Sequence, residues 1–242
     1  MALTAQQIVT LACQKAKVPG MVTMAGQILN SILLELAQEY DLACNLWTVE
    51  LVISPSGAGL YGAGPYSLPA NYLRMAVDEL TYVVDSIPYR MTQLTLAQMD
   101  IQINVAGDAS YPNRFATDVS VNNTTPLLYV YPPPLFNITL QLRYYGTQPD
   151  ITTPETSSTI PWFPCQNYLN ARLLGELYSI NSKIELASQY LGDGPLGAAG
   201  ILRRWLQLQG DKEMTGDSVI LDERYFSAGG QSFPPSKITG GI

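Results

Sequence analysis

The chain has 242 residues, of which 47% are hydrophobic and only 14% are charged, so it can fold around a core of its own. It contains no histidine, which excludes Ser-His-Asp and Cys-His nucleophilic sites and every histidine-based metal site. Its formal charge of −7 argues against a protein that holds nucleic acid phosphates, because each such contact needs a cation.

Two amphipathic helices are predicted at the N-terminus. The first covers residues 4–17 and begins with a capping box formed by Thr4 and Gln7. The second covers about residues 24–46, and Pro19-Gly20 separates the two, so we expect neighbouring helices joined by a short connection. The apolar stripes contain Ile8, Leu11, Ala12 and Ala16 in the first helix and Ile28, Leu29, Ile32, Leu33, Leu36, Tyr40 and Cys44 in the second.

Short strands are predicted from Thr48 to about residue 148. Apolar and polar side chains alternate in the first of them, as in a half-buried strand. Because the region lacks long helical crossovers, we expect the strands to pair antiparallel. A short helix in the middle would take Thr92 or Thr95 as its N-cap. The predicted strands cover residues 48–54, 80–84, 114–121, 127–131 and 137–145, and the short helix covers residues 94–103.

Helices resume after a polar connection at residues 149–161. Apolar residues spaced by four predict a helix from about Cys165 to Ser182, with Pro164 in its first turn. A second helix covers residues 184–191, and the Gly-Asp-Gly-Pro sequence that follows ends it. A third is predicted over residues 196–209, with Leu202, Trp205 and Leu206 facing inward.

These elements predict an α+β fold. The N- and C-terminal helices close into one helical bundle, an antiparallel β unit is inserted between them, and an extended C-terminal arm follows. The predicted parts are residues 1–47 for the N-terminal helix pair, 48–148 for the β insertion, 149–210 for the C-terminal helices and 211–242 for the arm.

The arm has no repeating apolar face and cannot bury a core alone. It nevertheless carries Tyr225, Phe226, Phe233 and Ile238, which suggests a segment that folds onto a partner. The prolines of Pro234-Pro235 would hold that stretch extended. A frayed terminus explains the same composition equally well.

One motif matches a nucleotide-binding pattern literally. Residues 57–62 read GxGxxG after a predicted strand, but Pro65 and Pro69 preclude the helix that would hold a pyrophosphate. We therefore interpret the glycine-rich residues 57–64 as a turn. We expect no catalytic residues, no cofactor and no metal site, so the protein is not predicted to be an enzyme.

The three cysteines fit neither a zinc pattern nor a disulfide framework. We expect Cys13, Cys44 and Cys165 to be buried, reduced thiols. The first ten residues lack the features of a signal peptide, and no apolar run reaches the ~18 residues of a membrane span. The expectation is a protein made in a cytoplasm, with no membrane partner.

The order of several short motifs resembles the head-to-tail adaptor, or connector, proteins of short-tailed bacteriophages. The helix pair ends at Leu46-Trp47, directly before the first strand, and the C-terminal helices follow Ile160-Pro161. The other matching stretches are YSLPANYLR at residues 66–74, LLYVYPPP at 127–134, LQLRYY at 140–145 and FPPSKITG at 233–240.

This resemblance implies a structural protein of the virion neck. Twelve copies would form a ring beneath the portal protein, with bundles side by side. The arm would bind the portal through Tyr225, Phe226, Phe233, Pro234, Pro235, Lys237 and Ile238. The tail nozzle or another tail protein would bind the opposite end, and DNA would pass through the channel without specific binding.

A different class of protein also fits part of the sequence. The chain has 15 tyrosines, and many of them lie in the predicted β unit, where exposed aromatic rings could stack on sugars. The alternative function is therefore a receptor- or glycan-binding β module of a virion or cell surface. An independent trimer or a sugar-dependent thermal shift would favour that alternative.

Overall fold

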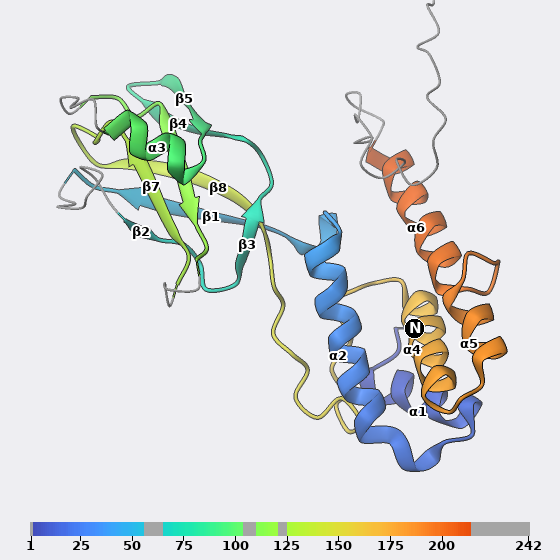
Figure 1. Cartoon of the computed structure of the whole chain (residues 1–242). Coiled ribbons are helices and arrows are strands. Elements are labelled where there is room, and N and C mark those ends of the chain that lie inside the picture. The colour runs from blue at the N-terminus through green and yellow to red at the C-terminus, as the bar shows by residue number, and fades with distance from the viewer. Residues whose placement is uncertain (1, 56–64, 104–109, 121–124, 214–242) are drawn as a thin grey trace, which may run out of the picture.

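A computed structural model describes residues 2–55, 65–103, 110–120 and 125–213. Helices from both ends of the chain pack into one bundle, and the residues between them form a β unit beside it (Figure 1). The α+β fold with an inserted β unit is therefore confirmed. The glycine-rich residues 57–64 and the proposed binding residues of the arm lie outside the described residues.

The bundle contains five α-helices with α4 between the others. The first two helices and the last two contact α4, so residues far apart in the sequence share one core. Leu29, Leu36, Leu169, Leu173 and Leu177 are fully buried in that core. The helices are α1 (Ala5–Ala16), α2 (Val22–Glu39), α4 (Gln166–Ile180), α5 (Ile184–Leu191) and α6 (Ala198–Glu213), with 3₁₀ turns at Pro19–Met21 and Ala43–Asn45.

Helix α1 begins as the sequence predicts. The Gln7 amide donates to the Thr4 hydroxyl at 3.3 Å, and the Gln7 side chain accepts from the Thr4 amide at 2.9 Å. The helix ends at Lys17, whose φ of 60° places it in the left-handed region. Leu11 was expected in the apolar stripe but is exposed, because Val9 and Cys13 complete the buried face instead.

Helix α2 is shorter than predicted and ends at Glu39. The backbone becomes extended at Tyr40, so the segment up to Asn45 is a connection rather than two further helical turns. Cys44 lies on this connection and is exposed, which corrects the expectation of three buried thiols. Pro164 precedes the N-cap of α4, Cys165, rather than lying in its first turn.

Contrary to the sequence expectation, one helical stretch is apolar and long enough to cross a membrane. It covers Pro19–Glu39 and has a mean hydropathy of 1.3. Helix α2 packs against both α1 and α4, and Leu29, Ile32 and Leu36 are buried there. The bundle core therefore accounts for these apolar side chains, and length and composition are weak support for a span.

The β unit contains two sheets that share one core. In the first, β8 (Ile138–Gly146) lies between β1 (Leu46–Ile53) and β3 (Tyr72–Met75). The second has the order β2-β7-β6-β5-β4. Tyr82, Phe115, Leu128 and Leu140 are buried between them. The remaining elements are β2 (Tyr66–Ser67), β4 (Glu79–Val84), β5 (Ile87–Gln93), α3 (Leu96–Ile103), β6 (Arg114–Asp118) and β7 (Leu127–Tyr131).

Strand β2 was not predicted, and two further features of the second sheet also differ from the sequence prediction. Strand β5 was not predicted, yet it forms a tight hairpin with β4 through Asp85 and Ser86, which both have positive φ. Strands β5 and β6 pair parallel, at Thr92↔Arg114 and Gln93↔Phe115, whereas antiparallel pairing was expected throughout. The short α3 lies in the crossover between them, and its N-terminal capping box uses Thr95 and Gln98.

Candidate interaction surfaces

The predicted binding residues of the arm begin 12 residues beyond the described part of the chain. Helix α6 continues to Glu213, past its predicted end at residue 209, so the residues that follow it start at 214. The binding roles of Tyr225 to Ile238 therefore stay predictions. The surfaces described below belong to the bundle, the β unit and the junction between them.

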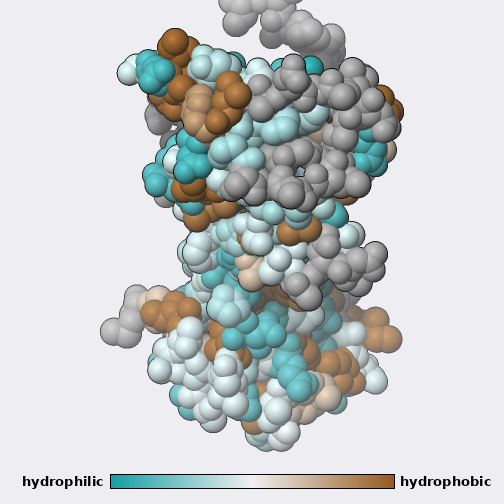
Figure 2. Space-filling model, turned by 90° about the vertical axis from the view of Figure 1, so that its left-hand side faces the viewer, coloured by the Kyte–Doolittle hydropathy of each residue, from teal (hydrophilic) through white to brown (hydrophobic). Residues whose placement is uncertain are grey.

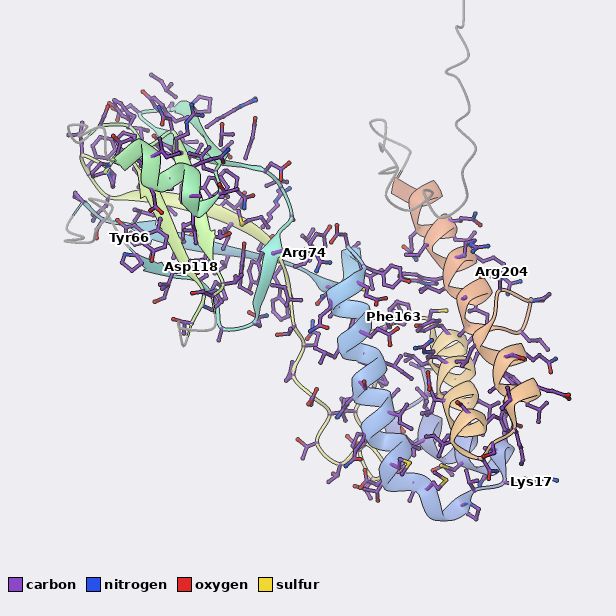
Figure 3. All side chains as sticks on the ribbon, in the orientation of Figure 1. Lys17, Tyr66, Arg74, Asp118, Phe163 and Arg204 are labelled. Atoms are coloured by element: carbon purple, nitrogen blue, oxygen red, sulfur yellow. The ribbon has the colours of Figure 1, made fainter. Side chains whose placement is uncertain are left out.

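Arg74 on β3 joins the β unit to the bundle (Figure 3). Its guanidinium donates to Asp41 at 2.8 Å through Nε and lies 2.6 Å from the same carboxylate oxygen through a terminal nitrogen. It also lies over the ring of Tyr145, 5.3 Å from the centroid. The remaining donors reach the carbonyls of Ala37, Gln38 and Tyr40 at 3.0–3.3 Å.

These contacts explain why α2 ends where it does. The last carbonyls of a helix lack partners within the helix, and a cation is favourable there because the helix dipole is negative at that end. Arg74 supplies both the donors and the charge from a different unit of the fold. It thereby fixes the direction in which the β unit leaves the bundle.

A second set of contacts lies within the β unit and ties the residue before β3 to the end of β8. The Tyr144 hydroxyl donates to the Asn71 side chain at 3.0 Å, and the Thr147 amide donates to the Asn71 carbonyl at 2.7 Å. A Cβ on Gly146 would lie 2.8 Å from the Asn71 amide nitrogen and 2.9 Å from its carbonyl oxygen. Only glycine fits this close approach without a shift.

A series of aromatic rings, two pairs stacked and the last pair edge-to-face, runs from the β-unit core to its surface. The Tyr82 and Tyr89 rings are 5.4 Å apart, Tyr89 and Tyr111 are 4.6 Å apart, and Tyr111 and Phe136 are 5.8 Å apart. Tyr82 is buried, whereas Tyr111 and Phe136 are exposed by 39% and 36%. The sequence places many tyrosines in the predicted β unit, but only the pairing of β4 with β5 shows that Tyr82 and Tyr89 lie side by side.

The bundle carries exposed apolar residues on two opposite sides. Met24 and Leu34 lie on the face of α2 that points away from α4, and no residue from Val22 to Leu34 is charged. Ile184 and Leu186 lie on α5, which packs on the other side of α4 (Figure 1). Figure 2 shows separate hydrophobic patches on the β unit and on the bundle.

A polar groove lies between the β4–β5 hairpin and β8. Its volume is about 500 Å³, and on its hairpin side Arg90 of β5 lies 3.5 Å from Glu79 of β4. Charges of both signs meet there, so the groove offers a polar contact surface. Within the described ranges, no three cysteine, aspartate or glutamate side chains come close enough to hold a metal ion. The groove is lined by Val77, Asp78, Glu79, Thr81, Arg90, Gln141 and Arg143.

Burial makes two of the three thiols and several phenols poor nucleophiles. Desolvation raises the pKa of the Cys13 and Cys165 thiols, so they are neutral near pH 7. It also raises the pKa of Tyr82 to about 12, with the neighbouring Tyr89 and Tyr111 adding to the effect. These groups therefore serve packing and hydrogen bonding, such as the bond from the Tyr82 hydroxyl to the Pro112 carbonyl at 2.9 Å.

Comparison with family models identifies the family of the whole fold. The model described as SU10 adaptor protein matches residues 4–217. The chain belongs to this family. The match runs from the capping box of α1 through both units and past the end of α6. A search of curated proteins found no match to the chain.

The SU10 adaptors are a phage head-to-tail adaptor family, so the resemblance stated from the short motifs is confirmed. The adaptor is accordingly a structural component of the virion rather than an enzyme, and it binds proteins of the head and tail. Arg74 was part of a matching motif, but its role at the junction was not foreseen. Its partners at residues 37–41 come from a segment that sequence patterns assign to helix.

Proposed function

We propose that the adaptor forms a closed ring that joins the portal protein to the tail. By the family resemblance the ring has twelve copies, with the bundles side by side and a central channel for DNA. It would lie in the neck of the virion, after synthesis in the host cytoplasm. The bundle, rather than the β unit, would supply the contact between copies.

The two opposite apolar faces of the bundle carry this proposal. Met24 and Leu34 mark one side, and Ile184, which is 75% exposed on α5, marks the other. Two different faces on opposite sides of a subunit favour head-to-tail contacts. Such contacts close into a ring when the rotation from one copy to the next is a whole fraction of a full turn. The low charged fraction of 14% is consistent with large neutral interfaces.

The arm is the proposed contact with the portal. Its apolar anchors are spaced among glycines and prolines, as expected of a segment that folds into a groove on its partner. Phe233 would contribute more than Lys237, because a buried aromatic anchor outweighs a charge at the rim. The tail nozzle, or another tail protein, would bind the opposite end of the ring.

The acidic balance suits the proposed channel. The chain has 13 lysines and arginines against 20 aspartates and glutamates. A channel wall that attracted phosphates would hold DNA that has to slide past it. We therefore expect no measurable binding of double-stranded DNA at physiological salt.

Paired face variants test the ring. Leu34→Arg and Ile184→Arg should each prevent rings, as measured by mass photometry of the chain alone and with portal. Mixing the two variants should give dimers only, because each contributes one intact face to a single contact. Ile101→Arg is the matched control, since Ile101 is 67% exposed on α3 and far from the bundle faces. Rings that survive both changes would overturn the proposed interface.

Truncation tests the arm separately. A chain lacking residues 217–242 should stay folded by circular dichroism but no longer co-sediment with purified portal rings. Phe233→Ala should weaken co-sedimentation more than Lys237→Ala does. If the truncated chain binds portal at full strength, the arm is not the contact.

The exposed aromatic rings favour one test of the alternative function. Tyr111 and Phe136 offer partly exposed rings at the end of the aromatic series. A sugar that raises the melting temperature of the chain, with the effect lost in Tyr111→Ala, would support a glycan-binding module. No thermal shift with a panel of sugars is the outcome that the adaptor function predicts.

A further inference from the structure

Strand β1 is an open edge of the first sheet. It pairs with β8 on one side only, in unbroken register from Leu46↔Tyr145 to Ile53↔Ile138. Within the described residues, no other strand pairs with the opposite edge. One edge of an eight-residue strand therefore presents free backbone donors and acceptors.

This edge lacks the features that normally protect such strands. It contains no proline and no bulge, and Glu50 is its single charged residue. Apolar side chains project from both of its faces, with Leu46 exposed by 42%, Trp47 by 39% and Val52 by 58%. A long, regular and apolar edge promotes pairing with another strand, so a specific strand should cover it in the assembly.

We propose that residues 218–222 of a neighbouring copy add to β1 as an extra strand. This segment reads SVILD, and Val219, Ile220 and Leu221 form the only run of three strand-favouring aliphatic residues after α6. Addition of an extended segment to a sheet edge gains main-chain hydrogen bonds and side-chain contacts together. Consecutive apolar residues in the added strand match the apolar residues on both faces of β1.

The position of α6 makes the neighbouring copy the donor. Helices α2 and α6 finish at the same end of the bundle, where the β unit also begins (Figure 1). In the proposed ring, the α2 side of one copy meets the α5–α6 side of the next, so the end of α6 comes close to the neighbour's β1. Residues 214–217 can span up to about 14 Å, which separates the strand from the helix.

This inference rests on the proposed ring, and it leaves the portal contact intact. The strand ends before Tyr225, so the anchors from Tyr225 to Ile238 remain beyond it. Each tail would first link two copies of the adaptor and then reach the portal. A ring whose copies are tied by strands would resist dissociation better than one held by bundle faces alone.

A disulfide trap tests the pairing. In a Cys44→Ser background, Val52→Cys combined with Ile220→Cys, and Glu50→Cys combined with Ile220→Cys, are oxidised gently after the rings have formed. The expected result on a non-reducing gel is a ladder of linked copies for at least one pair, with tagged and untagged chains joined. Ile101→Cys with Ile220→Cys is the matched control and should give no ladder.

The outcomes separate the two proposals. If mass photometry finds no rings of the full chain, either alone or with portal, the proposed function is overturned. If rings of normal mass form but neither pair gives links between copies, the strand inference alone is overturned. Bonds confined to single copies also overturn it, because the donor would then be the chain's own tail.

Two truncations give an independent readout. A chain ending at residue 222 keeps the proposed strand, whereas a chain ending at residue 213 lacks it. We expect the first to form rings as stable as the full chain and the second to need at least about tenfold more protein, since several hydrogen bonds per contact are lost. Equal ring stability of the two truncated chains would contradict the inference.

Discussion

The bundle and the β unit bury different kinds of side chain. The bundle core is dominated by alanine and leucine, and a Cβ on Gly175 of α4 would lie 2.6 Å from Leu191 of α5. The β-unit core contains Tyr72, Tyr82, Phe115 and Tyr144, and its aromatic series reaches the surface. The bundle thus depends on the close approach of helices, whereas the β unit depends on large rings brought together by strand pairing.

Because of this difference, the two units have different roles in the adaptor. A bundle with small residues inside keeps its apolar excess on two outer faces, which suits side-by-side contacts. The β unit is attached through the polar contacts of Arg74, which orient it without a shared apolar core. Stability should therefore be sensitive to core changes within either unit, and orientation should be sensitive to Arg74.

The largest effect is expected from removing leucine side chains inside the bundle. Leu33→Ala and Leu173→Ala should each lower the free energy of unfolding by about 2–5 kcal/mol, because both residues are buried. Leu34→Ala is the matched control, since Leu34 is 42% exposed on the outer face of α2, and the change should cost less than about 0.5 kcal/mol. Equal losses for Leu33 and Leu34 in urea denaturation would show that the faces of α2 are wrongly assigned.

A smaller effect is expected from glycine substitutions at the turn between α5 and α6. A Cβ on Gly197 would lie 1.9 Å from the Gly192 carbonyl oxygen, so Gly197→Ala must shift the backbone and should cost about 1–3 kcal/mol. Gly194 has no atom within 4 Å of the same position, and Gly194→Ala is the control. Thermal unfolding compares the two variants, and similar melting temperatures would contradict the close approach.

Alkaline pH should weaken the β unit through Tyr82. Its pKa in the folded chain is about 12, above the value of 10 of an unfolded tyrosine, because burial disfavours the phenolate. The contribution of the neutral Tyr82 phenol to the free energy of unfolding is fully present below pH 10 and is lost as the pH rises through 12. Urea unfolding at pH 9 and pH 11.5 should show this loss, and Tyr82→Phe should reduce it. An identical loss in wild type and Tyr82→Phe would contradict the assignment.

The smallest effect on stability is expected at the junction. Arg74→Ala should cost about 1 kcal/mol or less, because the Arg74–Asp41 pair is partly exposed. The distance distribution between spin labels on the two units should nevertheless broaden, since the guanidinium fixes the end of α2. Arg90→Ala is the control, because the Arg90 side chain is 75% exposed in its ion pair with Glu79. This change should leave the distance distribution unchanged.

Sequence patterns predicted the bundle well for a physical reason. Helix periodicity and capping act over a few residues, so Thr4 and Gln7 marked the start of α1, and residues 184–191 gave α5 with the observed bounds. The end of α2 was predicted about seven residues too far along the chain. Residues 40–46 continue an apolar pattern, and the partner that stops the helix, Arg74, comes from a different unit.

Sequence patterns predicted less of the β unit than of the bundle. Residues 127–131 were predicted as a strand with the observed bounds, but β5 was missed, since its alternation is weak and a proline is its second residue. The parallel pairing of β5 with β6 was not foreseen, because a helix as short as α3 does not signal a crossover in the sequence. The aromatic series and the open edge of β1 depend on strand order, which local patterns do not encode.

The sequence by itself determined the order of the helices, the shared bundle of both chain ends, and the absence of histidine-dependent chemistry. Those properties follow from composition and from patterns that repeat within a few residues. The tertiary structure decided where α2 ends, which tyrosines stack, which faces of the bundle remain apolar and exposed, and that β1 is an edge. These depend on contacts between residues far apart in the chain, such as Arg74 with Asp41 and Tyr89 with Tyr111.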